Sequence, residues 1–450
     1  MSFLTPGIVL TAGLGYLFAE NAHREITPLI VLAGTVAILF LLTGLLCRKF
    51  REPHIYRQLC MIIALGSLTA LIYAVFKAEI YFINPENIFS YYDIPLGITV
   101  IIGSLALLPA NLGLSLVITL LLIGSIEAVC FRLNTTPGDP ATTLHEPEFQ
   151  RPDDLLGYTG IPGSESRALK MKGKETIYDV SYSLDEFGRR LTPVAGSYSN
   201  ERYVMFFGGS FTFGEGLNNN ETLPYWLAQF SDRISPYNYG HPGYGPQHVL
   251  TQLQDSNIRD QIPETDGILI YPLISTHIQR AIGSMVVYST WGYSMPYYYL
   301  DADGLLKRDG NFTTGRPLRS MFYSLAGKSQ LFKYLELDLP FTAGKDDFRL
   351  TAAVIGAARS AYREKFGNDN FYVLIWPGAS TGKQLIPYLE ELNIRYLDYY
   401  SRINFGEEKY QIQGDGHPSA SAQQALARLI AEDIEKLDLI EHKRPMKTGD

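Results

Sequence analysis

The apolar positions of the chain are concentrated in residues 1–131. Three uncharged runs there, residues 3–19, 28–47 and 59–76, are close to the roughly 20 residues that cross a bilayer as a helix. A fourth run, residues 94–126, is too long for one span, and the Pro-Ala-Asn in its middle predicts a hairpin of two. We therefore predict a membrane region of about five transmembrane helices.

The charges of the loops predict how these helices are oriented. The loop after the second helix carries four basic residues, Arg48, Lys49, Arg51 and Arg57, whereas residues 77–93 hold one lysine and three acidic residues. Basic loops remain in the cytoplasm. Five helices would therefore place the chain that follows outside the cytoplasm, and four would leave it inside. We expect five, in a region that serves as an anchor.

Residues 132–200 connect this region to the rest of the chain. Proline, threonine and acidic residues dominate residues 132–155, which predicts an exposed linker. In residues 156–200, apolar side chains at every second position around Tyr178 predict an accessory β-hairpin. Its lysines include Lys170, Lys172 and Lys174. These most simply lie on solvated strand faces, and a basic rim for an acidic polymer is the alternative.

Residues 201–440 alternate between short apolar runs and amphipathic stretches, the pattern of strands followed by helices. The predicted strands are residues 203–207, a strand near Tyr237, and residues 267–273, 371–376 and 394–399. The predicted helices are residues 223–232, 247–253, 347–366, 382–392 and 419–437. Five strands, each followed by a helix, predict an α/β fold, a flavodoxin-like three-layer sandwich around a parallel five-stranded sheet.

An insertion at residues 284–345 interrupts this alternation. It contains a cluster of aromatic residues: Trp291, Tyr293, Tyr297, Tyr298 and Tyr299. Aromatic faces stack on sugar rings, so the insertion could line a carbohydrate site. The alternative is that these rings pack on the core, and the pattern leaves both readings open.

Composition narrows the classes of function. A formal net charge of -8 and a pI of about 5.6, without a cluster of basic residues after position 60, argue against a nucleic-acid-binding protein. The three cysteines, Cys47, Cys60 and Cys130, lie in or beside apolar runs, so the rest of the chain has none for a disulfide or a thiolate metal site. The sequence contains no P-loop, dinucleotide fingerprint or cluster of metal ligands. We expect neither a metal nor a cofactor.

Three segments combine turn glycines with reactive side chains. The first, VMFFGGSFTFGEG, predicts a buried strand that ends on two glycines and presents Ser210 at its carboxyl edge. The second, YNYGHPGYGPQ, contains Gly243, and the third, QGDGHPSA, places Asp415 and His417 ahead of a helix. A serine becomes a good nucleophile when a histidine takes its proton and a carboxylate orients that histidine. The alternative for Ser210 is a serine that caps a helix.

These motifs, in this chain order, resemble the SGNH (GDSL-like) hydrolase family over about residues 203–437. The resemblance implies that Ser210 is the nucleophile and that Asp415 and His417 complete a catalytic triad. It also implies an oxyanion hole to which Ser210 and Gly243 each contribute a backbone N–H group.

Two features depart from the family pattern. The family usually spaces its acid and base as Asp-x-x-His, whereas this chain has Asp-x-His, which leaves open whether Asp415 is the orienting carboxylate. The family's Gly-x-Asn-Asp block after the third strand is replaced by YPLISTHIQR. His277 is the best candidate for the missing oxyanion donor, and the alternatives are that it opens a helix, contacts a carboxylate or packs. Arg280, about one helical turn on, would bind an acidic substrate group or fix the loop.

The resemblance implies an SGNH-type serine esterase or O-acyltransferase that acts on acyl esters through an acyl-enzyme. Because similar domains tied to bacterial membranes often modify envelope glycans, we expect an integral protein of a bacterial inner (plasma) membrane with a periplasmic or extracellular catalytic domain. Its partners would be an acyl ester, carbohydrate and the lipid bilayer, and no nucleic acid. The alternative, which the two departures favour, is a non-catalytic SGNH-like membrane protein that binds glycans or serves as a scaffold.

Overall fold

The computed structural model describes residues 110–134, 141–193, 202–231, 233–255 and 257–441. The chain divides into two compact units between Leu133 and Asn134. Helix α5 (Ala110–Asn134) contains the predicted fifth span. Within the ranges given above, no helix is both long and apolar enough to cross a bilayer. The other predicted spans and the basic loop lie outside the described residues.

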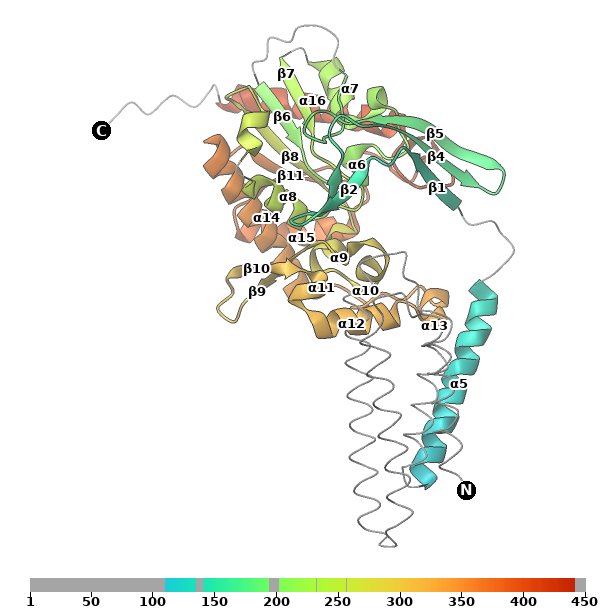
Figure 1. Ribbon diagram of the computed structural model, residues 1–450. Coiled ribbons are helices and arrows are strands. Elements are labelled where there is room, and N and C mark those ends of the chain that lie inside the picture. The colour runs from blue at the N-terminus through green and yellow to red at the C-terminus, as the bar shows by residue number, and fades with distance from the viewer. Residues whose placement is uncertain (1–109, 135–140, 194–201, 232, 256, 442–450) are drawn as a thin grey trace, which may run out of the picture. The chain divides into compact units, whose positions relative to one another are not determined.

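A parallel five-stranded sheet forms the centre of the second unit (Figure 1). Its strands are β6 (Arg202–Phe206), β7 (Ile234–Asn238), β8 (Gly267–Leu273), β11 (Phe371–Ile375) and β12 (Arg395–Asp398). They lie in the order β12-β11-β8-β6-β7, and every neighbouring pair is parallel. This is the flavodoxin-like strand order, in which ligands bind at the carboxyl edge where the winding direction reverses. The predicted α/β fold with a parallel five-stranded sheet is confirmed.

Helices cover both faces of this sheet because right-handed crossovers change face where the winding reverses, between β6 and β8. Helices α7 (Leu223–Phe230) and α16 (Ala420–Glu441) pack together on one face. Helices α8 (Pro246–Gln254), α14 (Lys345–Phe366) and α15 (Ser380–Glu391) cover the other. Four short helices lie next to strands in the sequence. They are α6 (Ser210–Phe213) after β6, η2 (Ile258–Gln261) before β8, α9 (His277–Ile282) after β8 and η4 (Glu408–Tyr410) after β12. The apolar sides of both layers bury β8 completely.

The predicted hairpin is part of a larger antiparallel sheet. Strands β4 (Glu165–Lys172) and β5 (Glu175–Ser183) form that hairpin, and β1 (Ala141–Glu146) adds a third strand beside β4. A smaller ribbon pairs β2 (Gln150–Asp153) with β3 (Gly157–Gly160). Residues 132–155, expected as a linker, thus contain two strands, because their backbone pairs with strands that come later in the chain. We call residues 141–193 the accessory sheet.

The accessory sheet shares a hydrophobic core with the turn that carries Ser210. Phe213 of α6 packs among its buried side chains, which include Phe149, Tyr178 and Tyr182. The Tyr182 hydroxyl accepts a hydrogen bond from the Gly216 backbone N–H at 2.8 Å, just before the turn η1 (Asn219–Glu221). The accessory sheet is therefore packed directly against the catalytic part of the sequence.

The insertion forms its own small core. Its elements are α10 (Met285–Val287), η3 (Tyr288–Gly292), β9 (Pro296–Leu300), β10 (Leu306–Asn311), α11 (Phe312–Gly315), α12 (Pro317–Ala326) and α13 (Gln330–Tyr334). Within the aromatic cluster, Tyr298 is buried, whereas Trp291 and Tyr293 are 38% and 41% exposed. Tyr298 thus packs in the core, as the second reading expects, whereas the carbohydrate reading of Trp291 and Tyr293 stays a prediction.

Candidate active site

Ser210 lies at the carboxyl edge of the sheet, beside the reversal of winding. Strand β6 ends at Phe206, and Gly208 and Gly209 lead into α6, of which Ser210 is the first residue. The Ser210 side chain is nearly buried. Its backbone N–H has no hydrogen-bond partner in the described part of the chain, as expected for the first residue of a helix.

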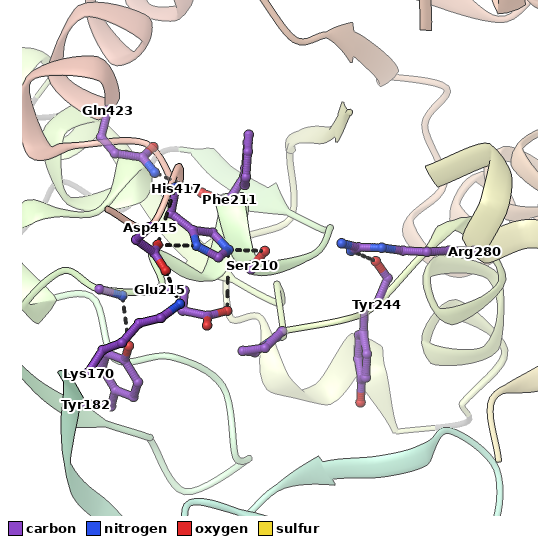
Figure 2. A network of polar contacts seen from close by, with 12 residues as sticks. Lys170, Tyr182, Ser210, Phe211, Glu215, Tyr244, Arg280, Asp415, His417 and Gln423 are labelled. Carbon is purple, nitrogen blue, oxygen red and sulfur yellow. Dashed lines mark hydrogen bonds and ion pairs between the residues drawn. The ribbon is translucent and has the colours of Figure 1, made fainter. Parts of the chain in front are cut away.

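His417 forms a hydrogen bond to Ser210 through its ring nitrogen Nε2 (Figure 2). The distance from His417 Nε2 to Ser210 Oγ is 2.9 Å, and that from His417 Nδ1 to Asp415 Oδ2 is 2.5 Å. An ionised carboxylate can only accept, so Nδ1 carries the proton and Nε2 is left to accept the serine O–H. This is the tautomer in which a histidine can act as base toward a serine.

Asp415 reaches His417 despite the shorter Asp-x-His spacing. Its Oδ2 accepts from the ring and, at 3.3 Å, from the backbone N–H of His417. The Asp415 side chain has no exposed surface. Of the two departures from the family pattern, this one leaves the Ser210, His417 and Asp415 chain of hydrogen bonds intact, which removes one argument for the non-catalytic alternative.

Two charged neighbours act on this chain of hydrogen bonds. Burial alone would raise the pKa of Asp415, but the hydrogen bond from His417 and the ammonium of Lys170 outweigh it and lower that pKa to about 2. Burial lowers the pKa of His417, but the bond to Asp415 and the charge of Glu215 outweigh it, so the net direction is upward. Glu215 Oε2 lies 3.6 Å from His417 Nε2.

Lys170 departs from its predicted place on a solvated strand face. Its ammonium forms an ion pair with Asp415 Oδ1, and its side chain is 19% exposed (Figure 2). No spacing in the sequence indicates this contact, because the two residues lie 245 positions apart. Lys172 and Lys174 are exposed, as predicted.

Gly243 lies at the end of the loop that follows β7. Its φ of +83° suits glycine, and a Cβ there would come within 2.2 Å of the Tyr158 hydroxyl and 2.9 Å of Trp291 Nε1. The Gly243 N–H has no partner in the part of the chain that the structure describes. It is therefore free to donate to a ligand.

His277 begins helix α9 after β8 and turns its ring toward Gly209, the residue before Ser210. A Cβ on Gly209 would lie 3.3 Å from His277 Nε2. His277 Nδ1 accepts from the Tyr271 hydroxyl at 2.7 Å and from the Ile274 backbone N–H at 3.5 Å. Since a backbone N–H can only donate, the ring proton lies on Nε2, which is buried and has no partner among the described residues. Burial, with the charge of Arg280, holds the His277 pKa well below its usual value, so the ring is neutral.

Arg280 approaches the same turn from the side opposite to His417 (Figure 2). Its Nη1 donates to the Tyr244 carbonyl at 2.8 Å and would lie 2.3 Å from a Cβ on Gly209. Arg280 is 8% exposed and forms no ion pair with any described residue. Arg280 thus fixes the Gly243 loop against the Ser210 turn, the second of the two roles expected for it, and adds an unpaired positive charge there.

No family model and no curated protein matches this chain. Similar solved structures include a member of the lipolytic protein G-D-S-L family from Veillonella parvula, with 12% identity and a TM-score of 0.31 over 52% of this chain and 97% of that one. A catalytic mutant of an acetylxylan esterase from Geobacillus stearothermophilus has 11% identity and a TM-score of 0.29 over 54% and 96%. An acetyl xylan esterase from the rumen bacterium Butyrivibrio proteoclasticus has 14% identity and a TM-score of 0.30 over 64% and 72%. These neighbours are esterases or lipolytic proteins by name, and likeness at this level leaves the function of this chain to be argued from its own site.

Proposed function

We propose that the protein is a serine esterase or O-acyltransferase of the SGNH type. The observation that carries this proposal is the hydrogen-bonded series Ser210, His417 and Asp415, together with N–H groups on Ser210, Gly243 and His277 that have no partner among the described residues. Such an arrangement supplies a base on one side of an ester carbonyl and donors for its oxygen on the other.

In the first half of the reaction, Ser210 Oγ attacks the ester carbonyl carbon while its proton passes to His417 Nε2. The carbonyl oxygen becomes an oxyanion, which the N–H groups of Ser210 and Gly243 and the Nε2–H of His277 would hold. His417 then gives its proton to the leaving alcohol as the C–O bond breaks. In the second half, water or an acceptor hydroxyl repeats these steps on the acyl-enzyme, which yields an acid or a new ester.

The full-length protein mixed with an activated acetyl or butyryl ester should release a burst of chromophore equal to one acyl group per Ser210. Ser210→Ala should lose this burst and its labelling by a fluorophosphonate, with a fall in kcat of at least about 10⁴-fold, because a triad acts as one unit. Labelling that persists in this variant would contradict the assignment, and a burst-free parent would favour the non-catalytic alternative.

We propose a carbohydrate ester as the substrate class because an exposed indole adjoins the oxyanion donors. Trp291 is 38% exposed, and its Nε1 would lie 2.9 Å from a Cβ on Gly243. Trp291→Ala should lower kcat/KM about 10-fold on an acetylated oligosaccharide, since stacking on a sugar ring is lost, and leave a small activated ester within about twofold. Tyr293→Ala, which removes an equally exposed ring of the same insertion, is the matched control. Equal losses on both esters would argue against stacking.

We also propose that the site works outside the cytoplasm of a bacterium, tethered by the apolar runs of residues 1–131. The basic loop at residues 48–57 supports this orientation. Reporter fusions at Asp154 test it. Activity there from a reporter that works only in the cytoplasm would overturn the localisation and leave the esterase proposal untouched.

A further inference from the structure

Strand β4 carries a lysine into the site. Lys170 pairs with Thr143 of β1 and with Tyr178 of β5, so it lies on the central strand of the accessory sheet. The register shifts directly after it. Its side chain leaves the sheet toward the loop of Asp415 and ends in the ion pair with Asp415 Oδ1. Lys170 thus comes before the five-stranded sheet in the sequence, and Asp415, whose carboxylate it contacts, comes after that sheet.

The short Asp-x-His spacing explains why an outside donor is needed. Both hydrogen bonds from His417 end on the same oxygen, Oδ2. The other oxygen, Oδ1, has Lys170 as its partner among the described residues. A carboxylate without exposed surface is costly unless each oxygen is bonded. Without Lys170, Asp415 could gain a partner for Oδ1 only by turning, and the His417 ring bonded to it would turn with it, away from Ser210 Oγ.

Other contacts of the accessory sheet reach the remaining catalytic loops. The Tyr158 hydroxyl donates to the Pro242 carbonyl at 2.8 Å, next to Gly243. Arg190 is buried, stacks over Phe213 of the Ser210 helix, and donates to the Leu217 carbonyl at 2.7 Å. The sheet therefore touches all three loops that build the site, and among the described residues Lys170 makes its one ion pair with the triad.

We propose that Lys170 is a positioning residue that orients Asp415, so that the accessory sheet is a working part of the active site. This inference rests on the proposed function for its kinetic consequences. Lys170 acts through Asp415 and need not touch substrate. Its charge also opposes those of Asp415 and Glu215 at the His417 ring, whose remaining polar neighbour is Ser210. Lys170 therefore keeps His417 neutral, and able to act as base, at a lower pH than the two carboxylates alone would allow.

The test compares Lys170→Met and Lys170→Gln with Lys170→Arg in the full-length protein. In the first two variants we expect kcat for an activated ester to fall about 10- to 100-fold, because a misplaced ring lowers the rate by about this much, with KM within about twofold. The acidic limb of the pH profile should move to higher pH. Lys170→Arg should restore both, because it keeps the cation. Lys172→Met, on an exposed position of the same strand, is the control and should match the parent.

A readout independent of turnover separates this inference from the proposed function. NMR titration of the His417 imidazole should show its pKa raised in the Met and Gln variants and near the parent value in the Arg variant. If the parent gives no burst while this pattern holds, the proposed function fails and the positioning role stands. If the Met and Gln variants keep the parent's kcat, acidic limb and His417 pKa, the inference is wrong. A loss of melting temperature alone, without a shift of that pKa, would also contradict it, because a merely structural lysine predicts that result.

Discussion

Ser210 separates two groups of polar residues that differ in how fully they are paired. On the His417 side, the series from Ser210 Oγ through His417 to Asp415 and Lys170 gives every polar atom a partner. On the other side, His277 Nε2 and Arg280 Nε are buried and have no partner among the described residues. We call these the paired side and the unpaired side.

The difference is physically meaningful because an unpaired buried donor costs about 1–3 kcal/mol. A fold that keeps two of them beside one serine loses stability there, unless a ligand supplies the missing acceptor. In the proposed reaction, the oxyanion is such an acceptor, and it forms only as Ser210 attacks. Proton transfer would thus use groups that are already in place, whereas charge stabilisation would be completed by the reacting ester itself.

The largest effect is expected on the paired side. Asp415→Asn should lower kcat by about 10⁴-fold, because an amide can donate to Nδ1 and favour the tautomer that cannot accept from Ser210. It should also lower the melting temperature, since the Lys170 ammonium loses its partner. Asp179→Asn, which breaks the exposed ion pair with Arg167, is the control and should change neither quantity much. Unaltered kcat in Asp415→Asn would mean that the paired side does not act as a unit.

On the unpaired side, we expect substitution to have the opposite effect on the melting temperature. His277→Leu combined with Tyr271→Phe removes the free N–H and also the hydroxyl that would otherwise lose its acceptor. We expect kcat to fall about 10²- to 10³-fold, as on loss of one oxyanion donor. The melting temperature should stay the same or rise, because both partners of the 2.7 Å bond are replaced by apolar groups, and the one donor left without its acceptor is the Ile274 N–H, whose contact is long at 3.5 Å. Tyr271→Phe alone is the control for kcat. A double variant that acylates like this control would leave Ser210 and Gly243 as the oxyanion donors.

A smaller effect concerns the dependence of activity on pH. Because the pKa of His417 is raised, kcat/KM should fall as the pH drops through a value above 6.5, the usual pKa of histidine. Glu215→Gln removes one cause of that upward shift, so the acidic limb should move to lower pH. Lys170 variants should move it the other way. A profile of kcat/KM from pH 5 to 9 for both variants measures this, and a shift in the same direction for both would refute the electrostatic account.

Much of the fold was predictable because hydrophobic periodicity is a local property. The strand predicted at residues 267–273 matches β8. The helix predicted at residues 347–366 starts two residues after the first residue of α14 and ends at the same residue. The accessory sheet was only half predicted. Strands β1 and β2 lie in a segment rich in proline and acidic residues, and the partner of β1 lies in β4, which a local pattern does not reveal.

Some residues of the site could be found from local sequence motifs, whereas others depend on contacts between segments that lie far apart in the sequence. Ser210, Gly243, Asp415 and His417 each occupy a glycine-rich turn at a strand or helix end, so motif and position singled them out. Lys170 fits the alternating pattern of an exposed strand residue, and its partner Asp415 lies 245 positions away. For His277, the local pattern indicated a position after the third strand. It could not give the tautomer, which depends on a tyrosine hydroxyl and a backbone N–H that only the folded turn brings together.

The long separation between Ser210 and His417, 207 positions, has a consequence for how the protein is made. Chains emerge from the ribosome in order, and their earlier parts begin to fold first. The serine, its turn and the accessory sheet are therefore synthesised well before the base, and during synthesis the nascent chain carries a serine without a partner to activate it. The series Ser210, His417, Asp415 and Lys170 closes only when the final strand and the loop after it have docked. A chain that is cut or stalled before residue 415 would lack the base, its carboxylate and also α16, which covers one face of the sheet, so its serine would stay inert.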